Sequence, residues 1–272
     1  MRGRYHAAVV HRSRSLAGAL AFAGGIAVVV AVAQVALAGL ALSRAAALSV
    51  DALASAATLG LAAGAVASLG EQSVAERLGL RRGRLDARQI ALAMLGIVAF
   101  SHAMEAALEL AGIVSPGLTR FDDALGGLDL EGAIFPLLAL SLGSAFGEEL
   151  FFRGLVQRGL APRIGVVPAI GVGALAFGAA HGDWAHGAAA ALLGVFLGVV
   201  THAAGSIRPA IAAHATNNAV ALVEKVADLQ LPSGSLATPA LLVAALTLAC
   251  VALVGILRPS RRALQSPSRP SD

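Results

Sequence analysis

The sequence predicts an all-α fold, a polytopic bundle of about eight transmembrane helices, and three observations support this prediction. The chain is 57% hydrophobic and only 13% charged, whereas about 25% of the residues in a soluble domain are charged. Its long apolar runs approach the ~20 residues that cross a bilayer as a helix. These runs are continuous and lack the alternation of a membrane β-strand. The arginines, finally, collect in alternate loops between the runs.

The apolar runs define the predicted spans, which are 16–42, 48–69, 89–113, 132–153, 164–182, 186–204, 208–228 and 237–257. The first run is longer than the apolar core of a signal peptide, so we expect it to be retained. Residues 1–257 form one predicted membrane domain. Residues 258–272 are rich in Pro, Ser and Arg and are expected to be a disordered basic tail.

The loop charges predict the orientation. Arginines occupy the segment before the first span, the loops after the second, fourth and sixth spans, and the segment after the last span. The loop after the third span, around Asp122 and Asp123, is acidic. Because basic loops remain in the cytoplasm, eight spans place both termini on the cytoplasmic side. This orientation explains the net charge of +4, so the bilayer, and no nucleic acid, is the expected partner. The Ala-, Gly- and Arg-rich composition favours a bacterial inner membrane.

Two adjacent carboxylates and an arginine interrupt the fourth apolar run. Ionisable groups at such depth are costly and commonly functional. Glu149 and Arg153 share a helical face, in the order that favours an ion pair. Glu148 points about 100° away and is free to act as a general base in a cavity. A charge cluster at the cytoplasmic end of the span is the alternative.

Two later runs hold polar residues at helical spacing. Phe177 and His181 are four residues apart, as are His214 and Asn218, so each pair shares a face. His214 and Asn218 can both donate hydrogen bonds to a developing oxyanion. Alternatively, His181 only ends a helix in a polar loop, and the other two residues only pack helix to helix.

One face of the third run carries His102, Glu105 and Glu109. We expect a polar packing face near the outer end of the span. Alternatively, these three side chains line the same cavity as Glu148.

The three patterns together resemble the CPBP (CAAX protease and bacteriocin-processing) family of intramembrane proteases, also called the Abi family. The matching segments are 147–154, 177–181 and 213–218, within a core of about 130–225. The resemblance implies a helix bundle around a cavity that opens towards the cytoplasm.

The resemblance also implies roles for individual residues. Glu148 and His181 would activate water, and His214 and Asn218 would bind the oxyanion. The supporting residues would be Glu149, Arg153 and Phe177. This mechanism needs no cofactor.

Zinc is the alternative, because Glu148, His181 and His214 could supply three ligands. The sequence lacks the His-Glu-x-x-His signature of many zinc proteases. Its single cysteine, Cys250, excludes a cysteine-rich metal site.

We therefore predict an endopeptidase that hydrolyses a peptide bond of a membrane protein or peptide substrate. A CAAX substrate needs a prenylated cysteine, which bacteria generally lack, so a bacterial membrane or peptide substrate is expected. One alternative is a proton-coupled transporter, since intramembrane Glu and His also form proton relays. Another is a non-catalytic bacteriocin-immunity or scaffold protein of the same fold.

The depth of His181 adds a geometric prediction. In an uninterrupted fifth span this residue would lie deeper than Glu148. We expect a helix break between residues 160 and 168, caused by Pro162 and Pro168. The side chains of Glu148 and His181 should then lie within about 3–6 Å, directly or through one water.

Overall fold

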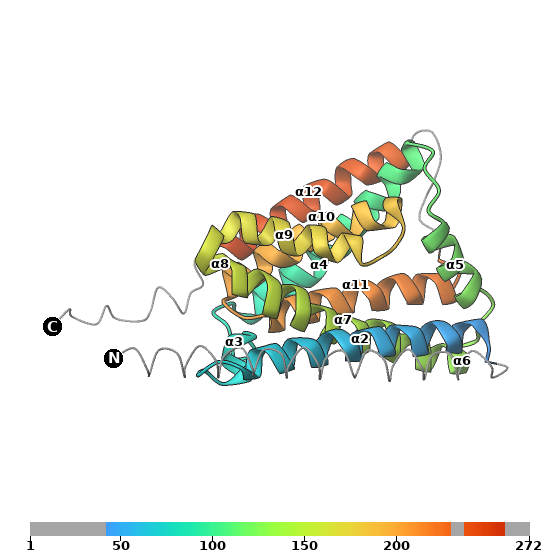
Figure 1. Ribbon diagram of the computed structural model, residues 1–272. Helices are drawn as coiled ribbons and strands as arrows, with labels where there is room; N and C mark the ends of the chain where they lie inside the picture. Colours follow the sequence, from blue (N-terminus) through green and yellow to red (C-terminus); the bar gives the residue numbers. More distant parts are fainter. Residues whose placement is uncertain (1–41, 230–236, 259–272) are drawn as a thin grey trace, which may run out of the picture.

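The computed structural model describes residues 42–229 and 237–258. Within these ranges the chain is helical and contains no strand, so the all-α prediction is confirmed (Figure 1). The predicted span 16–42 and the predicted tail 258–272 lie outside the described residues, apart from one residue each.

Each predicted span within the described ranges coincides with a helical stretch. The separate helices are α2 (Arg44–Ser68), α4 (Ala87–Leu110), α9 (Val166–Ala179), α10 (Trp184–Ala204), α11 (Arg208–Val226) and α12 (Ala237–Leu257). A 35-residue stretch, Leu130–Ile164, is helical throughout. Two short helices, α3 (Val74–Arg77) and α5 (Pro116–Leu125), lie in the connections.

In the described part of the chain, five helical stretches are long and apolar enough to cross a membrane: α2, α4, Leu130–Ile164, α10 and α12. Helix α9 is apolar but has only 14 residues. Helix α11 is less apolar because it carries polar groups such as His214, Asn217 and Glu224. The predicted count of about eight spans is therefore not confirmed.

The stretch Leu130–Ile164 changes its helical pitch along its length. It consists of α6 (Leu130–Pro136), the π-helix η1 (Leu137–Gly143), α7 (Ser144–Glu149), the π-helix η2 (Leu150–Gln157) and α8 (Arg158–Ile164). π-Helical segments inside α-helices occur frequently at functional sites. Here they flank the short α-helix that carries Glu148 and Glu149.

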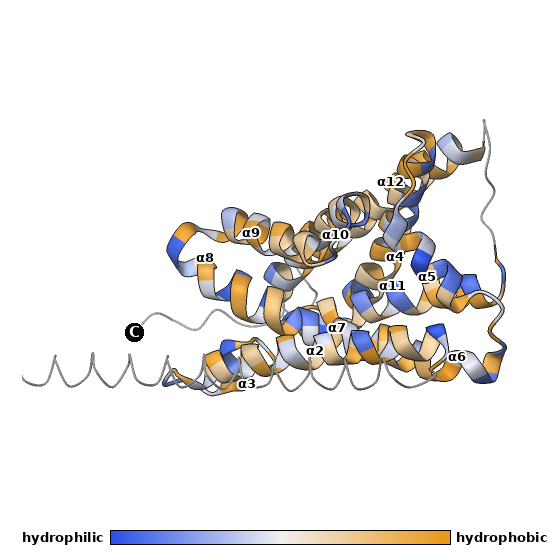
Figure 2. Cartoon of the chain, turned by 45° about the vertical axis from the view of Figure 1, so that its right-hand side comes forward, coloured by the Kyte–Doolittle hydropathy of each residue, from blue (hydrophilic) through white to orange (hydrophobic). Residues whose placement is uncertain are grey.

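Small residues allow close packing of the helices around this stretch. Helix α9 packs along α10, and α12 packs along α4 (Figure 1). A side chain at Gly178 would collide with Gly187, and one at Gly194 would press on the Ala174 backbone. Large apolar side chains are instead exposed, for example Val167 and Leu175 of α9. Figure 2 shows hydrophobic residues, in orange, along most of the helices. Such a surface suits contact with lipid chains.

The predicted break after residue 160 is present, but its cause differs from the prediction. Pro162 lies within α8 and Pro168 within the first turn of α9. The chain turns at Gly165, which has φ +88° and ψ 163°, a conformation that glycine adopts far more readily than other residues. Because α9 then ends at Ala179, His181 lies in the turn before α10.

Candidate active site

The predicted pairing of Glu149 with Arg153 is present at the centre of the bundle. Arg153 Nη1 donates to Glu149 Oε1 over 2.7 Å, and the two side chains are 1% and 0% exposed. Arg153 also donates from Nη2 to the carbonyl of Gly194 on α10, over 3.3 Å. Its guanidinium carbon lies 4.4 Å from the ring centroid of Phe177. The pair therefore connects α7 and η2 to α9 and α10.

His214 joins the two adjacent carboxylates, a link that the sequence did not predict. Its Nδ1 lies 3.0 Å from Glu149 Oε1, and its Nε2 lies 3.7 Å from Glu148 Oε2. Because a carboxylate only accepts hydrogen bonds, Nδ1 carries the proton and donates to Glu149. The Nε2 atom is thereby directed towards Glu148.

Glu148 has a separate partner on its own helix. The Ser144 hydroxyl donates to Glu148 Oε1 over 2.5 Å, and the Glu148 side chain is 19% exposed. Ser144 was not predicted from the sequence, although its position four residues before Glu148 is a signal for contact on a helix.

The Phe177 ring contacts the rings of both His181 and His214. The His181 ring lies edge-on to the Phe177 ring at 4.9 Å, and the His214 ring does so at 5.6 Å, between centroids. His181 Nδ1 lies 2.8 Å from the Phe177 carbonyl oxygen. A carbonyl can only accept, so Nδ1 carries the proton and Nε2 of the neutral ring is an acceptor.

Asn218 contacts the neighbouring π-helical segment. Its side-chain nitrogen donates to the carbonyl of Leu140, in η1, over 3.0 Å. A carboxamide nitrogen has two hydrogens, so one remains for another acceptor.

The four residues predicted to be catalytic line one cavity of about 220 Å³, which we call the central cavity. They are Glu148, His181, His214 and Asn218. Asn217 lines the same cavity, although it lies about 100° from Asn218 around the helix axis. A second cavity of about 250 Å³ lies beside α2 and shares Ser144, Glu148, Phe177 and His181 with the first. Glu148 and His181 therefore lie where the two cavities meet.

The residues of the third predicted span mainly make contacts between helices. His102 lies 3.4 Å from Glu105 and 3.3 Å from Glu224 of α11, measured between ring nitrogens and carboxylate oxygens. Glu109 accepts a hydrogen bond from Thr238 of α12. Of the three predicted residues, Glu105 is the one that also lines the central cavity.

The alternative zinc set does not fit the geometry found here. Among residues 42–229 and 237–258, no three His, Cys, Asp or Glu side chains are grouped so that they could hold a metal ion. Glu148, His181 and His214 thus form no such group.

The fold and the central cavity define a helical integral membrane protein with carboxylate and histidine groups inside its bundle. Residues 130–220 match the model of the Rce1-like family, described as type II CAAX prenyl endopeptidase Rce1-like. This match covers the segment with the three motifs and agrees with its resemblance to the CPBP family, and it supports a protease at the general level. No curated protein and no solved structure matches the chain.

Proposed function

We propose that the protein is an intramembrane endopeptidase in which Glu148 and His181 activate the attacking water. The observation that carries this proposal is the shared cavity that Glu148, His181, His214 and Asn218 line. The substrate is a membrane protein or a peptide. The description of the matching family names a prenyl endopeptidase, whereas the composition of this chain favours a bacterial substrate without a prenyl group.

The water would lie between Glu148 and His181. The Ser144 hydroxyl holds one oxygen of Glu148, which leaves Oε2 to accept a proton from water. The lone pair on His181 Nε2 orients the same water. The water oxygen attacks the carbonyl carbon of the peptide bond, and Glu148 takes the proton and then delivers it to the leaving nitrogen.

The oxyanion would be bound by His214 and Asn218. Because His214 Nδ1 already donates to Glu149, the donor to the oxyanion would be an N–H at Nε2. The second amide hydrogen of Asn218 provides the other donor. Glu149 and Arg153 are positioning residues in this scheme, since they act through His214.

The test compares the membrane proteome of cells that express the wild-type protein or Glu148→Gln. At least one protein should be cleaved only with the wild type, while the two chains accumulate equally. Glu105→Gln is the matched control, because it removes a carboxylate from the same cavity and should preserve cleavage. Full cleavage by Glu148→Gln would exclude the proposed role of this residue.

A further inference from the structure

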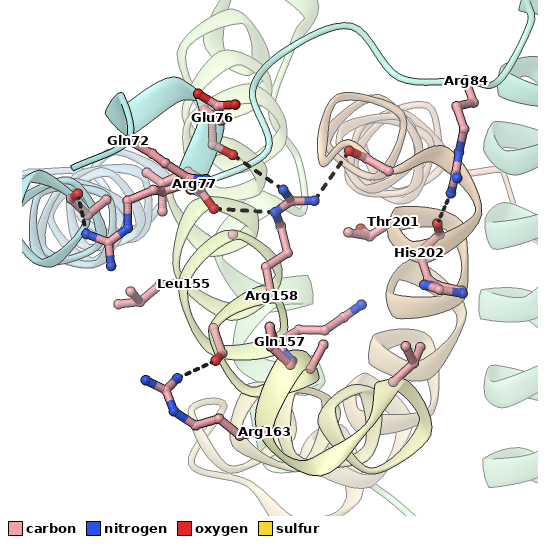
Figure 3. Close-up of a pocket in the computed structure, with 18 residues that line it drawn as sticks. Gln72, Glu76, Arg77, Arg84, Leu155, Gln157, Arg158, Arg163, Thr201 and His202 are labelled. Carbon is pink, nitrogen blue, oxygen red and sulfur yellow. Dashed lines mark hydrogen bonds between the residues drawn. The ribbon is translucent and has the colours of Figure 1, made fainter. Parts of the chain in front are cut away.

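A separate cavity of about 490 Å³ lies at one end of the bundle (Figure 3). It is bounded by the C-terminal ends of three candidate spans, α2, Leu130–Ile164 and α10, together with α3. It shares no lining residue with the central cavity. We call it the arginine pocket, because Arg77, Arg84, Arg158 and Arg163 line it.

The positive charge of the arginine pocket is largely uncompensated. Glu76 is the single acidic residue among the described residues that line it, and its carboxylate lies 3.5 Å from Arg81, which is not a lining residue. The lining arginines bond instead to backbone carbonyls, which are neutral: Arg77 to Ala67, Arg84 to His202, Arg158 to Glu76, Arg77 and Gly205, and Arg163 to Gly159. A guanidinium has five N–H donors, so donors remain on each of them.

A further observation concerns a hydroxyl that is buried in the same wall. Thr201 is 1% exposed and lines the pocket, and its Oγ1 has no hydrogen-bond partner among the described residues. Figure 3 shows Thr201 on the side of α10 that faces Arg158. An unsatisfied buried hydroxyl is unfavourable, whereas an oxygen atom of a ligand in this pocket would satisfy it.

Apolar residues continue from the pocket onto the outer surface. Pro162 and Val166 line the pocket, and Val167, next along α9, is 79% exposed. Leu175, eight residues further along the helix, is 69% exposed. A ligand could therefore place an anionic group among the arginines and apolar chains along α9.

We propose that the arginine pocket binds the phosphate group of an anionic phospholipid. Phosphate suits the geometry of arginine donors, and basic pockets between membrane helices bind lipid headgroups. The Thr201 hydroxyl donates to a phosphate oxygen, and the acyl chains follow the exposed face of α9. This proposal is independent of the proposed protease activity.

The test is native mass spectrometry of the full chain in detergent, titrated with phosphatidylglycerol or with zwitterionic phosphatidylcholine. We expect preferential binding of phosphatidylglycerol. Thr201→Val, which keeps the side-chain shape, should weaken it about tenfold, and Arg163→Gln, at an exposed position, about fivefold. Arg82→Gln is the matched control, since Arg82 is exposed two residues from the lining residue Arg84 but does not itself line the pocket.

Thermal melting distinguishes this role from a purely structural one. Without lipid, Thr201→Val should melt at or above the wild-type temperature, because it removes an unpartnered hydroxyl. Phosphatidylglycerol should raise the melting temperature of the wild type more than that of Thr201→Val. Equal binding of the two lipids, or equal effects of all three substitutions, would overturn the proposal. Stabilisation by inorganic phosphate and not by phosphatidylglycerol would assign the pocket to a free anion and overturn the lipid assignment.

Discussion

At the scale of single residues, the two neighbouring carboxylates have different surroundings. Glu149 is fully buried between Arg153 and His214, whereas Glu148 contacts Ser144 and faces a cavity. The spacing of four residues predicted the Glu149–Arg153 pair, because that contact is local to one helix. The contact between Glu149 and His214 joins residues 65 positions apart, so it depends on helix packing that periodicity does not specify.

Arg153→Ala should lower the amount of folded protein. It leaves the Glu149 carboxylate, which is 0% exposed, without its cation, and breaking a buried pair costs about 3–5 kcal/mol. Size-exclusion profiles and melting temperatures of the purified chain would measure the loss. Glu148→Gln, at a more exposed carboxylate, should behave as the wild type does, and a normal melting temperature for Arg153→Ala would contradict the structural role of the pair.

Ser144→Ala should reduce cleavage about tenfold, because it removes the hydroxyl that holds the Glu148 carboxylate in place, and a hydrogen bond to a charged group contributes about 1.5–3 kcal/mol. This prediction rests on the proposed function. Ser144→Thr, which keeps the hydroxyl, should restore activity towards the wild-type level. A rate unchanged in Ser144→Ala would show that this hydroxyl does not position Glu148.

At the scale of elements, helix breaks and caps decide where the histidines lie. The break before α9 was predicted from the length of the fifth span and from the depth that His181 would otherwise have in the membrane. Proline was the wrong cause. Proline is tolerated within α8 and at the start of α9, and the sharp turn requires the backbone freedom of Gly165. Neither the π-helical segments nor the Asn218 contact to Leu140 was predicted, because helical periodicity assumes a uniform pitch.

Gly165→Ala should destabilise the protein by about 1–3 kcal/mol, since a φ of +88° is strained for a residue with a Cβ. Gly159→Ala is the control at a helical position of α8, where an added Cβ meets no atom within 4 Å, and it should raise stability slightly. Melting temperatures should thus move in opposite directions. A loss at position 159 equal to that at 165 would argue against backbone strain as the cause.

The cap of α10 should make stability depend on pH in the acidic range. The N–H of Gly117 and the hydroxyl of Ser115 donate to Asp183 and lower the pKa of this carboxyl to about 2, below the ordinary value of about 3.9. Its stabilising effect is therefore complete above pH ~4 and is lost as the pH falls towards 2. The melting temperatures of wild type and Asp183→Asn should converge over this range. A constant difference between them from pH 5 to pH 2 would contradict the role of the charge.

At the scale of the whole molecule, charge is separated between the two ends of the bundle. Helices α3 and α8 lie at one end and α5 at the other, as Figure 1 shows. The first end contains the arginine pocket, and the second carries Asp122 and Asp123. The sequence predicted this separation well, because hydropathy and loop charge are properties of whole segments and depend little on side-chain detail.

Reporter fusions test the orientation that this separation predicts. A fusion within residues 81–88 should report the cytoplasm, because arginine-rich loops are retained there. A fusion near Asp123 should report the opposite side. A cytoplasmic signal from both positions would contradict the predicted topology.

The position of Glu148 and His181 between two cavities has a consequence that rests on the proposed function. A peptide that passes between these side chains has its amino-terminal part on one side of the pair and its carboxyl-terminal part on the other. After hydrolysis the two fragments would lie in separate cavities, one lined by α2 and one lined by α4 and α11. Each could then depart without displacing the other, and turnover would not depend on their order of release.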